Sequence, residues 1–427
     1  MTCTVFRCKR RKDARILPRA LPLIFAITDL IHFDHTRGEG GRKAPVLPGA
    51  SLPKSTIVMR TTLLITAAAL IFTPQLRAQE AELDEATLEA VEHMLIEKMS
   101  EERIPGLSVA LVMDGQLVWS DGYGMADLEN YVPATATTAY RTASIGKTMT
   151  ATAVMQLAER GLIDLNAPVQ RYCPAFPEKR WPVTTRHLLG HTSGIRHYGG
   201  PNEEAELFNT VHYDSIVEVL DIFKDDSLLF EPGTAHQYST FGYNTLGCVV
   251  EGASGQDFLS HMREHVFESA GMESTRDDDP AALIPRRAGG YLLTENGELR
   301  NSRAVDMSSK LPAGGFITTA EDLARFAIAV MDHRLIQAET FEQMLTPVRL
   351  RNGEMVGYGL GWGLFPGEQW YGEREAFHGG VTPQVSGTLY LLPDRRFAVA
   401  ILTNLEGVPG RTELSANIAK VVLGLGI

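Results

Sequence analysis

Cysteine is scarce in this sequence, with four residues in 427. Cys3 and Cys8 lie near the start, and Cys173 and Cys248 stand 75 positions apart, so the pattern excludes a disulfide framework and a CxxC metal or redox motif. Because free cysteines are commonly buried, we expect Cys173 and Cys248 to be two buried thiols, with one disulfide between them as the alternative.

Long apolar runs are also missing, since no stretch reaches the roughly 20 residues that cross a bilayer. The apolar run at 61–72 is preceded by Arg60 and followed by the small residue Ala78. This arrangement is typical of a secretory signal at 59–78. We therefore expect a mature chain that begins near Gln79, has no membrane span and is periplasmic or secreted, with a buried N-terminal helix as the alternative.

Basic charge is scarce beyond the first 78 residues. Residues 1–78 hold 13 Lys and Arg against 4 Asp and Glu, out of 40 and 52 in the chain, so residues 79–427 carry a net charge of −21. Such an acidic body repels phosphate backbones, which excludes nucleic acid as a partner. Residues 1–58 are basic, rich in proline and without periodicity, and we expect a non-domain extension there, from a start assigned too early.

The composition of the whole chain, 44% hydrophobic and 22% charged, is that of a globular protein. Helical patterns and loops dominate from about 144 to 345, whereas strand patterns lie on both sides of that stretch. The two ends of the chain should therefore assemble one antiparallel sheet flanked by terminal helices, with a mostly helical domain inserted, which is an α+β fold over 79–427. Helices are predicted at 82–101 and around 414–425, and strands at 107–113, 116–120, 385–392 and 397–403.

A serine and a lysine stand three residues apart at the start of an apolar helical pattern, residues 144–160. This spacing places Ser144, near the helix N-cap, and Lys147 on one helix face. A lysine desolvated at a buried helix end can lose its charge and take the serine proton, and the N–H groups of the helix start can face an oxyanion. An ordinary capping serine with a surface lysine is the alternative for this motif alone.

Two further segments follow in order. Residues 230–244 read FEPGTAHQYSTFGYN, and residues 377–381 read FHGGV before a predicted strand. With the SxxK motif, they resemble the three sequence elements of serine β-lactamases and penicillin-binding proteins. The resemblance covers about 82–425 and is closest to the class C-related branch, particularly the mitochondrial β-lactamase-like serine proteases. It implies the same α+β fold as the strand and helix patterns.

The resemblance also implies roles for individual residues. Ser144 would attack the scissile carbonyl, Lys147 would take or relay its proton, and Tyr238 would pass a proton to the leaving group. The oxyanion hole would consist of the backbone N–H groups of Ser144 and Val381. The substrate-binding residues would be Thr240, His378, Gly379 and Gly380.

Three of these positions depart from the family pattern, with Thr240 in place of asparagine, Gly379 in place of threonine and His378 in place of lysine. A glycine has no hydroxyl to hold a substrate carboxylate, and histidine titrates near neutrality. We therefore expect slow β-lactam turnover and a preference for neutral esters or internal peptide bonds. If an anionic substrate is preferred after all, another cation such as Arg196 or Arg303 must hold it.

No cofactor or metal is expected. His187, His191 and His197 have a spacing that could place two ligands on one helix face, but no HExxH, cysteine or carboxylate completes a zinc site, and we interpret them as part of a structural loop.

The glycine-rich stretches at 357–363 and 314–315 are interpreted as strand and turn glycines rather than as a nucleotide site. Tyr358 and Trp362 are interpreted as half-buried strand aromatics, with walls of the active-site cleft as the alternative.

The sequence therefore predicts a periplasmic or secreted serine hydrolase that acts on ester, amide or peptide bonds of a small-molecule or peptide substrate. A β-lactamase or D-alanyl-D-alanine carboxypeptidase is the alternative within the same chemistry. A non-catalytic binding or self-assembling protein of the same fold is the alternative outside it. The motifs do not determine the oligomeric state.

Overall fold

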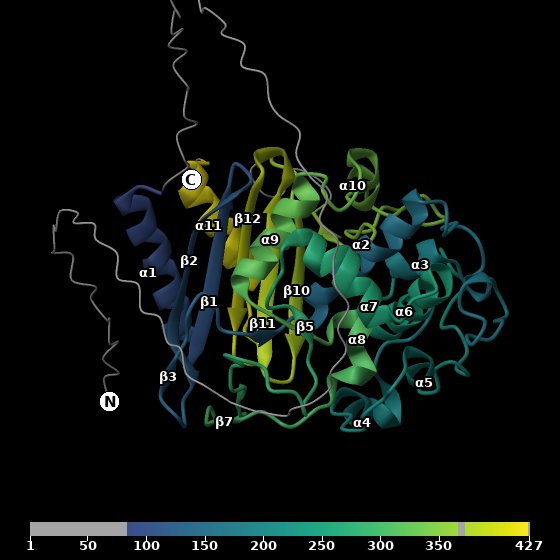
Figure 1. Ribbon diagram of the computed structural model, residues 1–427, viewed down its shortest axis with the longest axis horizontal. Coiled ribbons are helices and arrows are strands. Elements are labelled where there is room, and N and C mark those ends of the chain that lie inside the picture. The colour runs from purple at the N-terminus through teal and green to yellow at the C-terminus, as the bar shows by residue number, and fades with distance from the viewer. Residues whose placement is uncertain (1–82, 366–371, 426–427) are drawn as a thin grey trace, which may run out of the picture. The chain divides into compact units, whose positions relative to one another are not determined.

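The computed structural model describes residues 83–365 and 372–425, all within the compact unit Gln79–Ile427 (Figure 1). The extension predicted at 1–58 and the signal predicted at 59–78 lie outside the described residues. Within the described part of the chain, no helix is long and apolar enough to span a membrane.

A seven-stranded antiparallel sheet forms the centre of the fold. Strands from opposite ends of the chain pair in its middle, with Val109 opposite Ile401. The sheet is thus assembled from the two chain ends, as the sequence pattern predicts. Its strands, in spatial order, are β3 (Val132–Pro133), β2 (Gln116–Asp127), β1 (Gly106–Met113), β12 (Phe397–Thr403), β11 (Val385–Leu392), β10 (Ala376–Thr382) and β9 (Gly363–Leu364).

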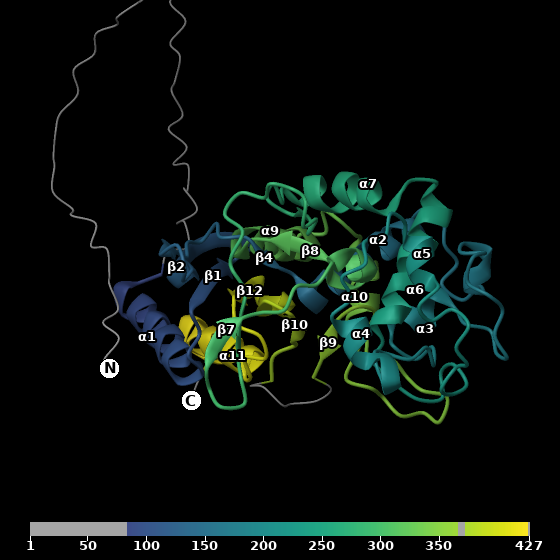
Figure 2. The same cartoon turned by 90° about the horizontal axis from the view of Figure 1, so that it is seen from below.

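Helices cover both faces of this sheet because the strands are apolar on both faces (Figure 2). On β12, Phe397, Val399 and Ile401 join the core under the two terminal helices. The alternate residues Ala398 and Ala400 join the other core, where their small side chains let a helix approach the strand closely. The terminal helices are α1 (Glu85–Glu102) and α11 (Arg411–Leu423), and the helix on the other face is α9 (Ala320–Met331).

The inserted part of the chain lies beside the sheet and is mostly helical, as predicted (Figure 1). Its two central helices, α2 (Gly146–Glu159) and α6 (Thr240–Ser254), pack together and bury most of their side chains. Short helices surround them: α3 (Thr185–Leu189), α4 (Glu203–Leu207), α5 (Ile216–Leu220), α7 (Phe258–Met262), α8 (Leu311–Gly314) and α10 (Ala338–Met344). Two small sheets complete it, of β4 (Tyr140–Arg141), β8 (Phe316–Thr318) and β5 (Arg276–Asp277), and of β6 (Tyr291–Leu293) and β7 (Leu299–Asn301).

Cys173 and Cys248 form a disulfide, so the expectation of two free buried thiols is wrong. The Cα atoms of the two cysteines lie 5.4 Å apart, although 75 residues separate them in the sequence. Close packing explains the proximity: a methyl group on Gly252 of α6 would lie 1.7 Å from the carbonyl oxygen of Tyr172, so only glycine lets this segment reach the helix. No local sequence pattern signals such a tertiary contact.

Candidate active site

Ser144 lies in a 3-10 turn, η1 (Ala143–Ile145), that leads directly into α2. The α-helix begins at Gly146, and its N-cap residue is Ile145, so the predicted capping position of Ser144 is wrong. Ala143 has a left-handed backbone with φ of 44°. Residues other than glycine seldom adopt this conformation, and where they do it is often at functional sites. The turn therefore holds the serine in a constrained position beside the helix start.

Lys147 reaches back over the first turn of α2 toward the serine. Its Nζ lies 3.1 Å from Ser144 Oγ and donates a hydrogen bond to the Ala313 carbonyl oxygen at 2.9 Å. The side chain is 1% exposed, and burial lowers the pKa of Lys147 from 10.5 to about 7. A substantial fraction of the amine is therefore neutral at pH 7 and can accept the Ser144 proton.

Tyr238 lies on another side of the amine, two residues before α6. Lys147 Nζ is 5.0 Å from the centroid of its ring. The Tyr238 hydroxyl is buried and has no hydrogen-bond partner of good geometry. Burial raises the pKa of Tyr238 far above its ordinary value, and the neighbouring Ser144 side chain lowers it to a smaller extent. The phenol therefore keeps its proton at neutral pH and is available as a proton donor.

Thr240, the first residue of α6, completes the contacts of the lysine. Its Oγ1 lies 3.5 Å from Lys147 Nζ, and the side chain is only 5% exposed. The structure thus places this predicted substrate-binding residue against the lysine. Ser144, Lys147, Tyr238 and Thr240, which span almost 100 residues of sequence, form one cluster.

His378 stands on β10 and is buried. Its Nδ1 lies 2.7 Å from the Gly379 carbonyl oxygen, which can only accept, so Nδ1 carries the proton and Nε2 accepts from the Tyr358 hydroxyl at 2.9 Å. Burial and the nearby Lys147 lower the pKa of His378 to about 3. The expectation that this histidine titrates near neutrality is therefore wrong, because desolvation keeps it neutral.

The two aromatic residues that were expected to be half-buried, Tyr358 and Trp362, are both buried.

The rest of β10 passes close to the serine turn. A methyl group on Gly380 would lie 2.6 Å from the Thr142 carbonyl oxygen and 3.1 Å from the side chain of Ala143, so a glycine is needed for this approach. Val381 follows and is 49% exposed. β9 pairs only with Ala376 and Phe377, so the edge of β10 from His378 onward carries no strand of the described residues. The backbone of Val381 thus lies at an open sheet edge near Ser144.

Arg411, the first residue of α11, is a cation near the site that the sequence motifs do not reveal. A methyl group on Gly379 would lie 3.8 Å from its Nη2, and its Nε donates to the Gly387 carbonyl oxygen at 3.2 Å. Burial lowers the pKa of Arg411, and no carboxylate among the described residues forms an ion pair with it. No motif marks this arginine, because helix packing alone brings it to β10.

Arg196 and Arg303, the two cations considered from the sequence as holders of a substrate anion, are both engaged in ion pairs. Arg196 makes a two-pronged ion pair with Glu206, at 2.8 Å for each bond, and a further one with Asp226 at 2.6 Å. Arg303 pairs with Glu204 at 2.7 Å. Arg411 is therefore the better candidate to hold a substrate anion.

The three histidines considered as metal ligands do not converge. The described residues hold no group of three or more His, Cys, Asp and Glu side chains placed to bind a metal. His187 belongs to the capping box of α3, where its Nδ1 accepts a hydrogen bond from the backbone N–H of Thr184. His191 and His197 instead flank Tyr238.

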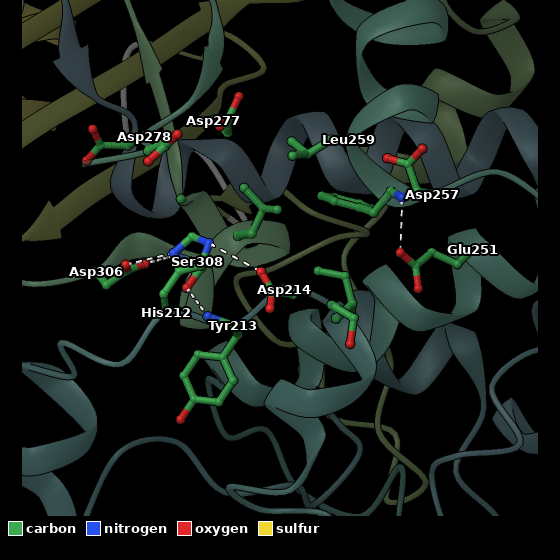
Figure 3. A pocket seen from close by; sticks show the side chains of 16 residues that line it. His212, Tyr213, Asp214, Glu251, Asp257, Leu259, Asp277, Asp278, Asp306 and Ser308 are labelled. Atoms are coloured by element: carbon green, nitrogen blue, oxygen red, sulfur yellow. Dashed lines mark hydrogen bonds and ion pairs between the residues drawn. The ribbon is translucent and has the colours of Figure 1, made fainter. Parts of the chain in front are cut away.

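A second pocket, of about 220 Å³ and with an acidic lining, is formed by residues of the inserted part (Figure 3). None of the predicted site residues lines it. Its buried Asp306 accepts hydrogen bonds from the Ser308 backbone and lies 2.9 Å from His212 Nδ1, and its buried Asp278 pairs with Arg141. These carboxylates are thus already partnered within the protein.

Comparison with known proteins agrees with this geometry. The beta-lactamase family model matches residues 91–423. The mitochondrial serine beta-lactamase-like protein LACTB of Mus musculus is 31% identical over 413 residues, which cover 71% of this chain and 74% of that protein. Penicillin-binding protein 4* of Bacillus subtilis (strain 168) is 29% identical over 329 residues, which cover 73% of this chain and 71% of that protein.

Solved structures show the same architecture. The octameric penicillin-binding protein homologue from Pyrococcus abyssi superposes with a TM-score of 0.69 at 27% sequence identity. The match covers 79% of this chain and 77% of that chain. The predicted fold class, a β-lactamase/transpeptidase-like α+β fold, is confirmed.

Proposed function

Because the chain belongs to the beta-lactamase family, we propose that it is a serine hydrolase that cleaves ester, amide or peptide bonds through an acyl-enzyme on Ser144. One observation carries the proposal: Lys147 Nζ lies 3.1 Å from Ser144 Oγ and is buried, with no carboxylate of the described residues paired to it. A lysine in that environment can be a base at neutral pH.

Acylation begins when the neutral Lys147 amine takes the proton of Ser144 and Oγ attacks the substrate carbonyl. The oxyanion that forms is stabilised by the backbone N–H groups of Ser144 and Val381. Tyr238 gives its proton to the leaving group as the scissile bond breaks, and the proton held by Lys147 restores the phenol. Water then attacks the acyl-enzyme by the reverse proton transfers, which releases the acid and regenerates Ser144.

Neutral acyl esters or internal peptide bonds are the proposed substrate class. Gly379 supplies no hydroxyl for a carboxylate, and His378 is held neutral, so neither residue attracts an anion. Arg411 favours a second candidate, a carboxylate-bearing substrate such as a β-lactam or a D-alanyl peptide, because a half-buried guanidinium that pairs with no carboxylate of the described residues gains from an anion.

The disulfide supports a location outside the cytoplasm, and we propose that the mature protein is periplasmic or secreted. Disulfides persist in oxidising compartments and are rare in the cytosol. Cys173 and Cys248 are both buried, so their bond has the character of a structural rather than a catalytic disulfide.

The first test is hydrolysis of a chromogenic ester, a cephalosporin and a D-Ala-D-Ala peptide by the wild type and by Ser144→Ala. We expect turnover of at least one substrate that Ser144→Ala abolishes. Turnover that survives in Ser144→Ala would contradict the assignment of the nucleophile. No turnover of any substrate would instead favour a non-catalytic binding or self-assembling protein of this fold.

The second test compares kcat/KM for the cephalosporin and a neutral ester in the wild type, Arg411→Ala and Gly379→Thr. The neutral-substrate proposal predicts faster ester hydrolysis in the wild type, with Gly379→Thr shifting the preference toward the cephalosporin. If Arg411 holds a carboxylate, Arg411→Ala slows the cephalosporin about 10- to 150-fold, the effect of one charge-assisted hydrogen bond, and leaves the ester unchanged. Arg303→Ala, which removes an exposed paired arginine, is the control.

A further inference from the structure

We propose that His191 and His197 are positioning residues that clamp Tyr238 in place for proton transfer to the leaving group. The inference rests on the proposed function, because it gives these histidines a task in the chemistry assigned to Tyr238. Together the two histidines are called the histidine clamp below. With His187 they form the histidine pattern that was weighed as a metal motif, but the structure directs both rings to the tyrosine.

The clamp accepts hydrogen bonds from two consecutive backbone N–H groups just after Tyr238. Ser239 N donates to His191 Nδ1 at 3.1 Å, and Thr240 N donates to His197 Nδ1 at 3.2 Å. On the other side of the tyrosine, Gln237 N donates to the His191 carbonyl oxygen at 2.9 Å. The backbone is thus held on both sides of Tyr238, at the point where the chain enters α6.

The two imidazole rings also contact the tyrosine ring itself. The centroid of His191 lies 4.3 Å from that of Tyr238 with the planes tilted by 41°, and the centroid of His197 lies at 5.5 Å with the planes nearly perpendicular. Contacts from two rings restrict the motion of the phenol. Lys147 Nζ, 5.0 Å from the same ring, bounds a third direction.

The hydrogen bonds require both imidazoles to be neutral, because a ring nitrogen that accepts an N–H bond cannot carry a proton. Burial lowers the pKa of His191 and His197, and the charge of Lys147 lowers both further. The proton of His191 is therefore on Nε2, which is buried without a partner. The structure therefore holds both histidines in the neutral form that these two hydrogen bonds need.

The backbone at His191 supports a positioning role. Its φ is 54°, in the left-handed region that only a few per cent of residues other than glycine adopt, histidine being among the more frequent of them. Such a conformation persists where the surrounding structure requires it. Here it places the carbonyl oxygen and the imidazole of one residue on the two neighbours of Tyr238.

The activity test uses leaving groups of different pKa. His191→Leu and His197→Leu remove the acceptor and keep most of the apolar volume. A good leaving group such as a nitrophenolate needs no proton, whereas an alkoxide does, so misplacing Tyr238 slows alkyl esters more than aryl esters. We expect kcat/KM, which reports on acylation and not on the deacylation common to both esters, to fall about 10- to 100-fold for alkyl esters, part of the usual contribution of a general acid, and to change less than about threefold for nitrophenyl esters.

Further variants separate this role from general support of the fold. Asparagine places an amide oxygen near the position of Nδ1, so His191→Asn and His197→Asn should restore the alkyl ester rate toward wild type. His187→Leu removes an equivalent acceptor on Thr184, away from Tyr238, and should leave the leaving-group dependence unchanged. In a Tyr238→Phe background, the leucine variants should cause no further loss.

A spectroscopic arm tests the clamp without turnover. In protein labelled with ζ-13C tyrosine, the signal that disappears in Tyr238→Phe is that of Tyr238. We expect it to shift or broaden in His191→Leu and His197→Leu and to stay in place in His187→Leu. An unchanged Tyr238 signal, or equal slowing of aryl and alkyl esters, would overturn the proposal. If no ester is hydrolysed, the proposed function fails while the signal still decides whether the clamp holds the tyrosine.

Discussion

The burial of Lys147 predicts a stability difference that depends on pH. The perturbation is Lys147→Met, which keeps the length of the side chain and removes the amine. Burial lowers the pKa of this lysine from 10.5, its ordinary value in the unfolded chain, to about 7. Between these two values the unfolded chain holds the proton and the folded protein does not.

The direction in which the free energy of unfolding changes with pH follows from proton binding. Where the unfolded state binds more protons, the free energy of unfolding rises with pH, by about 1.4 kcal/mol per pH unit for one group. Relative to Lys147→Met, the wild type should therefore gain about 3 kcal/mol between pH 7 and pH 9.5. Below about pH 6 the difference should be nearly constant, because the amine is then mostly protonated in both states.

Urea unfolding of both proteins at half-unit intervals from pH 5.5 to 9.5 measures this difference. Lys310, a second buried lysine whose pKa burial lowers to about 8, is present in both proteins and cancels in the comparison. A difference that stays flat from pH 7 to 9.5 would show that the folded protein keeps Lys147 charged. That result would refute the assignment of the amine as a neutral base.

Three further predictions concern the close approach at the site, the disulfide and the start of the mature chain. Gly380→Ala should reduce kcat/KM at least tenfold, because the new methyl group would lie 2.6 Å from the Thr142 carbonyl oxygen and push β10 from the serine turn; unchanged steady-state kinetics would contradict it. Replacing both Cys173 and Cys248 by alanine should lower the free energy of unfolding by about 2–5 kcal/mol in urea titrations, because the disulfide closes a loop of 75 residues; a loss below about 1 kcal/mol would count against it. N-terminal sequencing of the exported protein should find Gln79 at or near the start, whereas a cytoplasmic protein that retains the signal segment would contradict the proposed location.

Much of the fold could be predicted because its signals are local. The predicted strands at 385–392 and 397–403 coincide with β11 and β12, since their apolar runs and the intervening turn are contiguous in the sequence. The relation of Ser144 to Lys147 also follows from local helix geometry. The start of α2 was misplaced by two residues, because a 3-10 turn and an α-helix share the same apolar pattern.

The features that could not be predicted depend on packing between distant segments. The neutrality of His378 comes from burial beside Tyr358, and the position of Arg411 comes from the docking of α11 on the sheet. His191 and His197 belong to a histidine pattern that is visible in the sequence, but only the fold shows that they contact Tyr238 and do not form a metal site. Local sequence specifies which side chains are available, and tertiary packing determines their charge and partners.

The nucleophile is tested most directly by mass spectrometry of the protein after reaction with a fluorophosphonate or a slowly turned-over β-lactam. The structure predicts one adduct per chain, mapped by peptide analysis to Ser144, and none in Ser144→Ala. Lys147→Met should react far more slowly, because the amine that takes the serine proton is absent. An adduct on another residue, or no adduct with either reagent, would contradict the assignment of Ser144 as the nucleophile.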